Sequence, residues 1–403
     1  MASPGQRLAL YATVGSFARA ATAGLPPAII LGVLAAGGSA SDGSLLIASI
    51  TAIAGITGPL IGATVDRFEQ PRRGYLLATV ILAAASAALA IGIGSWPTAI
   101  LVLVAGLAGL FHPMLTGSWS AQVRRVAPEI SAPRAYAVDA ATYNIGEILG
   151  PALVGIAYVY DATTPGAASL EVVTVLYLCA GLALLFVKVP HRERTVPPDP
   201  LHHALRGLSI FWHSVPLRRT TIISTVAFVG FAGFVISAPL LGADLAGDAG
   251  TGALLLAVTA AGALLGSLLY ARRPIRRVGP GTLVVLATAG LGGLMALLAA
   301  APTYAVAVPL AFLLGVMNAP QLTSVMQVRD RESPTHLRSL VFVAAASLKT
   351  GAFAVGSLLA AALVAWGWRP LLLSSAAIEV IAVLLGLGIA RQGRRRRTPE
   401  HAS

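Results

Sequence analysis

Three charged residues lie deep inside long apolar runs of the chain. Arg19 lies eleven residues into the first of these runs, Glu147 about twelve residues into the fifth, and Lys349 about ten residues into the eleventh. A charge near the centre of a bilayer costs about 2.5 to 3.5 kcal/mol on insertion scales. If the runs cross a membrane, these residues are therefore candidates for ion pairing, proton transfer or ligand binding.

Asp139, Tyr143 and Glu147 are spaced four residues apart, which places them on one face of a helix. Asn144 lies beside this polar stripe. At about 1.5 Å per residue, Arg19 and Glu147 reach similar depths of roughly 16 to 18 Å from the same side, so the two side chains could meet. Three interpretations remain open: a coupling path for protons or cations along this face, a structural ion pair between two helices, and contact with a substrate.

The apolar runs are long enough to cross a membrane as helices. Of 403 residues, 56% are hydrophobic and 11% are charged, and the mean hydropathy is +0.80, whereas soluble domains carry about 25% charged residues. Backbone groups in lipid must be paired within their own segment, and the runs lack the alternation of barrel strands. The prediction is an all-α integral membrane protein with twelve transmembrane helices. The predicted spans are 8–34, 44–65, 74–94, 97–119, 136–159, 169–188, 219–241, 251–270, 281–300, 303–325, 339–365 and 370–390.

Basic residues are concentrated on one side of the predicted membrane protein. Of the 28 Lys and Arg residues, 25 lie at the termini or in the even-numbered junctions between spans. The few charged residues of the odd-numbered junctions are mainly acidic. By the positive-inside rule, both termini are cytoplasmic. The net charge of +12 thus indicates orientation, and no nucleic-acid partner is expected. Because Arg outnumbers Lys by 26 to 2, as is typical of GC-rich bacterial genomes, we expect a multi-pass protein of a bacterial plasma membrane.

The two halves of the chain are similar to each other. Residues 62–73 share a Gly and an Arg pair with 266–277, and the triplet 122–124 recurs at 327–329, at offsets of 204 and 205. A polar, Pro-rich break lies between the halves and contains a predicted interfacial helix. We therefore predict two pseudo-symmetric six-helix bundles. The predicted boundaries are 1–188 and 219–390 for the bundles, 189–218 for a cytoplasmic central loop and 391–403 for a basic cytoplasmic tail.

Twelve spans, cytoplasmic termini, a long central loop and two similar halves resemble the major facilitator superfamily of secondary transporters over essentially the whole chain. The loop after the second span is similar to the signature loop of that family, with two extra residues before its Arg pair. The matching positions are Gly62, Asp66, Arg67, Arg72 and Arg73. The resemblance implies that Asp66 and Arg67 belong to a charge cluster that latches the outward-facing state. In the second half Tyr270 stands at the Asp position, so a one-sided latch is expected.

A second motif lies in the fifth span and partly resembles the motif associated with proton-coupled drug exporters of that family. Its residues are Gly146, Gly150, Pro151 and Gly155. A Gly-Pro pair lets helices approach closely and frees backbone groups, although an ordinary kinked helix would have the same pair. The fourth-span motif with a membrane-embedded Arg is absent, because Ala105 and Ala108 stand at its polar positions.

In the family fold, the first, fourth, seventh and tenth spans line the substrate cavity. The fourth and tenth spans thus contribute the cavity candidates His112, Asn318 and Gln321. Tyr143 and Asn144 of the polar stripe in the fifth span and the membrane-embedded Lys349 of the eleventh span are further cavity candidates. We expect Lys349 to bind an anionic substrate, pair with a carboxylate or lose its proton, and His112 either to sense protons or to be a hydrogen-bonded packing residue. Glu379 lies in the twelfth span, which is peripheral in the family, so we expect it to serve packing or an oligomer contact.

These features predict a transporter and not an enzyme. The sequence has no phosphate-binding Gly-rich loop and no metal-ligand spacing of His and Cys, so no catalytic residue, metal or cofactor is expected. We expect a monomer in the lipid bilayer that uses alternating access and protons to export a small hydrophobic compound. Two alternatives remain: a proton-coupled uptake permease for a small polar or anionic metabolite, and a membrane sensor or scaffold that does not transport.

Overall fold

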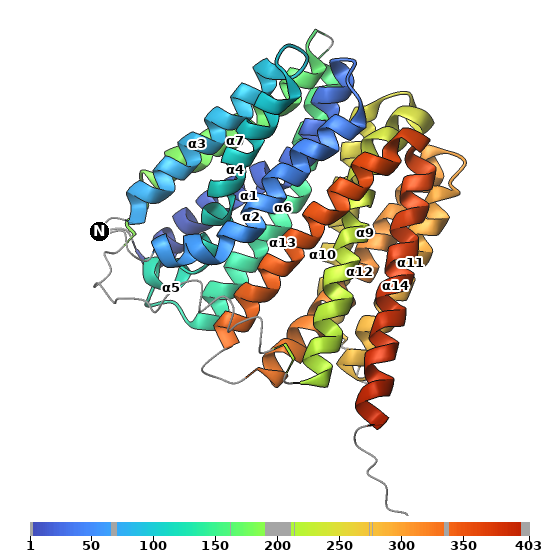
Figure 1. Ribbon diagram of the computed structural model, residues 1–403. Coiled ribbons are helices and arrows are strands. Elements are labelled where there is room, and N and C mark those ends of the chain that lie inside the picture. Colours follow the sequence, from blue (N-terminus) through green and yellow to red (C-terminus); the bar gives the residue numbers. More distant parts are fainter. Residues whose placement is uncertain are drawn as a thin grey trace, which may run out of the picture.

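The protein is an assembly of long helices packed side by side (Figure 1). The computed structural model describes residues 3–65, 71–161, 163–189, 211–212, 214–273, 275, 277–333 and 338–395, and its regular elements within these residues are helical. The long helices are α1 (Pro4–Ala35), α2 (Ala40–Val65), α3 (Pro71–Gly92), α4 (Thr98–Pro113), α6 (Ala132–Tyr160), α7 (Pro165–Leu184), α9 (Val215–Ala246), α10 (Ala249–Arg272), α11 (Pro280–Ala299), α12 (Tyr304–Glu332), α13 (Arg338–Leu363) and α14 (Trp368–Arg395). The short elements are η1 (Met114–Ser118), α5 (Val123–Val126) and η3 (Val364–Trp366). The prediction of an all-α protein is confirmed.

The outer surface of the helix assembly is apolar, as a membrane requires. Eleven helices in the described part of the chain are long and apolar enough to span a bilayer, and α6, which contains Asp139 and Glu147, is the further long helix. Large apolar side chains point outward, among them Ile56 and Leu103, which are 72% and 73% exposed. In a soluble protein so many exposed apolar residues would cause aggregation. The chain is therefore a multi-pass membrane protein.

Several helices extend beyond the predicted spans. α12 continues to Glu332 although its apolar run stops near residue 325, and α14 continues to Arg395 instead of stopping near 390. Hydropathy detects only the part of a helix that lies in lipid, whereas backbone hydrogen bonding carries the helix on through polar residues. Arg329, which the sequence placed in a loop, consequently lies on α12 and is 1% exposed.

Because the long helices alternate in direction, the chain begins and ends at the same end of the assembly. We call the end with Ser3 and Arg395 the terminal end and the opposite end the distal end. At the terminal end, Arg7 Nη2 donates a hydrogen bond of 2.6 Å to Glu129 Oε1, which holds the pKa of Glu129 below its usual value. At the distal end, the Asp161 carboxylate accepts hydrogen bonds from Thr163, and these lower the pKa of Asp161.

Glycines bring α1 and α6 into direct backbone contact. A Cβ at Gly146 would lie 2.6 Å from Arg19 Cβ, and a Cβ at Gly150 would overlap the carbonyl oxygen of Ala20. Neither position has room for a side chain, so the two helices approach more closely than larger residues would permit. This contact sets the position of α6 relative to Arg19.

The N-terminal half (α1–α7) and the C-terminal half (α9–α14) meet mainly toward the distal end. A Cβ at Gly155 of α6 would lie 2.7 Å from the carbonyl oxygen of Gly250 on α10, and Ser41 Oγ on α2 donates to the carbonyl oxygen of Ala361 on α13 at 2.6 Å. Distal residues of the C-terminal half, such as Ala253, also join the core of the N-terminal half. Figure 1 shows α2 and α13 lying next to each other where the halves adjoin.

Some predicted features fall outside the described residues. Asp66 and Arg67 of the signature loop do so, as do 190–210, which include most of the predicted interfacial helix, and the tail from residue 396. Within the predicted central loop, Phe211 is buried against Leu217 of α9 and against α13.

Substitution Gly150→Ala tests the close contact between α1 and α6. The added methyl group would overlap the backbone of α1, so we expect a loss of about 1–3 kcal/mol in the free energy of unfolding. The measurement is thermal unfolding in detergent. Gly293→Ala on α11 is the matched control, because a Cβ there meets no atom within 4 Å. Equal melting temperatures for the two variants would contradict the role assigned to Gly150.

Candidate functional site

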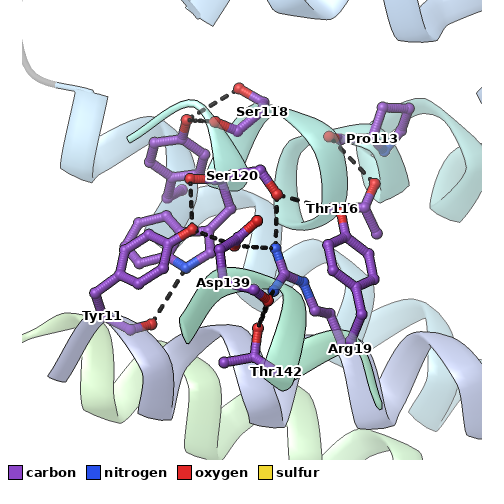
Figure 2. A network of polar contacts seen from close by, with 11 residues as sticks. Tyr11, Arg19, Pro113, Thr116, Ser118, Ser120, Asp139 and Thr142 are labelled. Atoms are coloured by element: carbon purple, nitrogen blue, oxygen red, sulfur yellow. Dashed lines mark hydrogen bonds and ion pairs between the residues drawn. The ribbon is translucent and has the colours of Figure 1, made fainter. Parts of the chain in front are cut away.

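The Arg19 guanidinium lies at the centre of a buried polar network (Figure 2). Nη1 donates to the backbone carbonyl of Asp139 and Nη2 to Asp139 Oδ1, both at 2.7 Å. Nη2 also donates to Ser120 Oγ at 2.7 Å, and Nη1 to Thr142 Oγ1. The guanidinium carbon lies 3.5 Å from the centre of the Tyr143 ring, a cation–π contact. Arg19 is 2% exposed, so these contacts replace its hydration.

Asp139 has a second partner on α1. The Tyr11 hydroxyl donates to Asp139 Oδ1 at 2.5 Å, and the Tyr11 ring is stacked on Trp119 with centroids 5.1 Å apart and planes 9° apart. The Tyr75 ring meets the same Trp119 edge to face at 5.2 Å. The sequence offered no pattern that would connect Tyr11 or Tyr75 to this site, because their partners lie more than forty residues away in the chain.

A local change of helix type positions Ser120 and Trp119. α4 ends at Pro113, and the π-helical segment η1 follows immediately. Proline cannot donate to the carbonyl four residues earlier, and a π turn adds a residue, so the chain after it is rotated relative to a regular helix. The rotated segment leads directly into Trp119 and Ser120. Pro113 was the one sequence signal for this irregularity.

Of the two carboxylates on α6 that Arg19 could meet, it pairs with Asp139 and not with Glu147. Side chains on a helix lean toward its N-terminus, and the long Arg side chain follows that direction. Gly146 lies directly against the Cβ of Arg19, so the guanidinium reaches a residue about two turns earlier on α6. Depth in the membrane, which the sequence does indicate, does not settle which residues face each other.

Glu147 instead faces the other half of the protein. Its side chain is exposed and interacts electrostatically with Lys349 on α13. Lys349 Nζ lies 3.9 Å from the centre of the Phe228 ring on α9. Pro151 has no N–H to donate to the Glu147 carbonyl, so the motif also leaves a free backbone acceptor beside this carboxylate. The stripe of Asp139, Tyr143 and Glu147 thus contributes to two sites. Asp139 and Tyr143 contact Arg19, and Glu147 interacts with Lys349.

Arg329 is a second buried cation near Lys349. Its Nη2 donates to Ser224 Oγ at 3.1 Å, and its charge acts on Lys349. The sequence missed Arg329 because it follows the apolar run of α12 and was counted with the loop charges. The internal repeat was the available signal, because the triplet that ends at Arg124 recurs as the triplet that ends at Arg329.

The polar stripe of α12 faces the interior of the C-terminal half. Gln321 is buried, and its Nε2 donates to Thr288 Oγ1 on α11 at 2.7 Å. Asn318 and Gln321 line a small cavity together with Glu379 of α14, which is 1% exposed. An oligomer contact through Glu379 is therefore excluded by its burial. Of the other cavity candidates, His112 and Asn144 are half-buried, on α4 and α6.

A larger surface groove lies away from these charged residues. Its volume is about 840 Å³, and it is lined at the distal ends of α6 and α7 by mostly apolar residues, with Asp161 and Glu171 among them. Within the described residues, His, Cys, Asp and Glu do not gather in groups of three or more that would hold a metal ion.

A fold of long membrane-spanning helices with ionisable side chains in its interior is typical of secondary transporters. The chain matches the family model of the Major Facilitator Superfamily over residues 11–352, and it belongs to that family. No curated protein sequence matches the chain. The resemblance stated from the sequence is thus confirmed.

Solved structures with similar folds are transporters. A mutant of the nucleoside transporter NupG is 13% identical, covering 95% of this chain and 99% of that chain with a TM-score of 0.76. A POT family transporter in complex with a thioalcohol-conjugated peptide is 12% identical, covering 97% and 96% with a TM-score of 0.72. A bacterial homologue of the human lysosomal transporter Spinster, inward-facing and unoccupied, is 16% identical, covering 98% and 97% with a TM-score of 0.68. At these identities the likeness shows the fold alone.

Substitution Asp139→Asn tests how strongly the Arg19 network depends on its counter-charge. Asn keeps the shape of the side chain but leaves a buried guanidinium uncompensated, so we expect unfolding to become easier by about 3–5 kcal/mol. Ser120→Ala removes one neutral hydrogen-bond partner of the same guanidinium, so we expect a loss of about 1 kcal/mol. Thermal unfolding in detergent measures both. Equal losses would show that the charge of Asp139 has no special role.

Proposed function

We propose that the protein is a proton-coupled secondary transporter in which Glu147 and Lys349 form the coupling pair. The observation that carries this proposal is that the charges of Glu147, in the N-terminal half, and Lys349, in the C-terminal half, act on each other. Alternating access requires two halves to move against each other around a central site. A charge pair that spans the two halves is therefore made in one state and weakened in the other.

The charge on Glu147 follows from the state of this pair. A nearby cation favours the ionised carboxylate, whereas loss of that cation shifts the equilibrium toward the protonated form. Movement of the halves thus changes the proton occupancy of Glu147. The halves in this proposal are residues 1–188 and 219–390, connected by the central loop.

We assign Arg19 and Asp139 a different role, that of a fixed pair. Both residues belong to the N-terminal half, on α1 and α6, whose backbones are in contact. Movement of one half against the other leaves this pair intact, so it holds the coupling helix α6 in place. Asp66 and Arg67 are proposed to latch the terminal end of α2 when that end closes.

The proposed orientation places the terminal end in the cytoplasm, on the basis of the positive-inside rule. Gly155 and Gly250 bring the two halves together at the distal end. This contact favours a state closed to the outside, and the Spinster homologue with a similar fold is inward-facing.

For the substrate, we propose a small, largely apolar compound that is exported. Support comes from the aromatic series on α9, where Phe228, Phe231 and Phe234 have successive ring centroids 5.8 and 5.9 Å apart, and from the exporter-like motif on α6. A second candidate is uptake of an anionic metabolite. It is favoured by two neighbouring cations, the half-buried Lys349 and the buried Arg329. Among the described residues, Glu147 is the acidic residue whose charge acts on Lys349.

Substitution Glu147→Gln tests the coupling. In proteoliposomes with an imposed pH gradient, we expect wild-type protein to move protons when a lipophilic cation, antibiotic or metabolite from a panel is added. Glu147→Gln should abolish the proton movement but retain substrate exchange, since Gln keeps the side-chain shape and cannot ionise. Glu171→Gln is the control, because Glu171 is exposed at the distal end of α7.

Opposite directions of substrate and proton movement would support export, and the same direction would support uptake. Unchanged proton coupling in Glu147→Gln would overturn the assignment of this residue. Loss of folding in that variant would indicate a structural carboxylate instead.

Substitution Gly250→Leu tests the distal contact between α6 and α10. A side chain there would collide with α6, since even a Cβ would lie 2.9 Å from the carbonyl oxygen of Gly155. We expect the distal ends to separate. The reporter is a cysteine introduced by Leu254→Cys, in a background in which Cys179→Ser removes the native cysteine. We expect its labelling by a membrane-impermeant maleimide to rise several-fold.

Gly293→Leu in the same background is the control for a bulky residue that touches nothing across the halves. Equal labelling of both variants would contradict a distal gate at Gly250.

A further inference from the structure

A small cavity inside the C-terminal half contains a carboxyl group without a partner. The cavity has a volume of about 30 Å³ and lies between α9, α11, α12 and α14. Glu379 is 1% exposed, and its Oε2 atom is buried and accepts or donates no hydrogen bond within the described part of the chain. The residues that line the cavity are Ala227, Phe228, Phe231, Leu291, Met295, Leu314, Asn318, Gln321 and Glu379.

Among the described residues that line the cavity, none offers a counter-charge for an ionised Glu379. The other lining residues from all four helices are uncharged, and the two polar ones are amides. Lys349 lies on the other side of the wall residue Phe228, with Nζ 3.9 Å from the centre of that ring. Burying an ionised carboxylate without a partner is far more costly than burying a neutral carboxylic acid.

The protein provides space for this side chain. A Cβ at Gly292 of α11 would lie 2.9 Å from Glu379 Cβ, and a Cβ at Gly230 of α9 would lie 3.2 Å from Glu379 Oε1. Two helices thus present glycines where any other residue would press on the side chain of Glu379. A cavity of this volume also exceeds the roughly 10–15 Å³ that one water molecule needs, and three polar side chains reach it.

We propose that Glu379, Asn318 and Gln321 form a buried proton-binding site in which a protonated Glu379 is hydrogen-bonded to one water molecule. The neutral acid removes the cost of an unpaired charge, and the water satisfies the otherwise unpartnered Oε2. Phe228 lies between this site and Lys349, so rotation of that ring is the route by which the site communicates with the centre of the protein. The site does not depend on the role of Glu147.

Infrared spectroscopy of purified protein at neutral pH tests the site. We expect a carboxylic-acid C=O band in wild type that disappears in Glu379→Gln, with the intensity of one carboxyl group. The band should shift in D₂O, because the proton exchanges through the cavity water. It should persist in Glu147→Gln, so a failure of the coupling proposal is distinguishable from a failure of this one.

If Glu379→Gln removes a carboxylate band and not an acid band, Glu379 is ionised in the wild type and the proposal is overturned. An acid band that sodium converts to a carboxylate band, with choline as the reference cation, would also overturn it and indicate a metal-cation site. If Glu379→Gln does not fold, Asn318→Ala serves as the second variant. It removes an amide that lines the cavity and would hold the proposed water molecule, so we expect the same band to shift. An unchanged band would count against the site.

Discussion

The cost of an uncompensated charge in a poorly solvated interior governs how the polar residues of this protein are arranged. Arg19 meets that cost with Asp139, two hydroxyl groups and an aromatic ring within one half. Glu147 and Lys349 meet part of it through the electrostatic attraction between their opposite charges, which come from different halves. Glu379 has no such partner among the described residues. One physical constraint thus produces three arrangements, and these differ in whether a movement of the halves changes them.

Close helix packing makes these arrangements specific. Lipid offers no hydrophobic force between helices, so small residues that allow dense contacts hold them together. Gly146 and Gly150 bring the backbone of α6 against α1, and that contact determines which residue of α6 the Arg19 side chain reaches. Farther along the same helix, Gly155 meets α10 of the other half. A single helix therefore carries a fixed contact and a contact between the halves.

The sequence predicted the helical fold and the family, because long apolar runs and the distribution of basic residues are properties of the chain itself. It did not predict the partner of Arg19, because spacing gives the depth of a residue but neither its direction around the helix nor its rotamer. The π-helical turn after Pro113 and the extension of α12 to Arg329 were also hidden, since hydropathy responds to composition alone. The space around the Glu379 side chain could not be predicted, because it depends on Gly230 and Gly292, which lie on two other helices.

The location of a charge pair relative to the boundary between the halves determines what it can do. A pair within one half keeps its geometry while the halves move, so its energy is the same in every state and it can only position other groups. A pair across the boundary changes its energy with the movement, and by linkage the movement then depends on protonation. Arg19 and Asp139 have the first kind of location, and Glu147 and Lys349 have the second. Phe228, which contacts Lys349 and also lines the cavity of Glu379, connects the boundary to the interior of the C-terminal half.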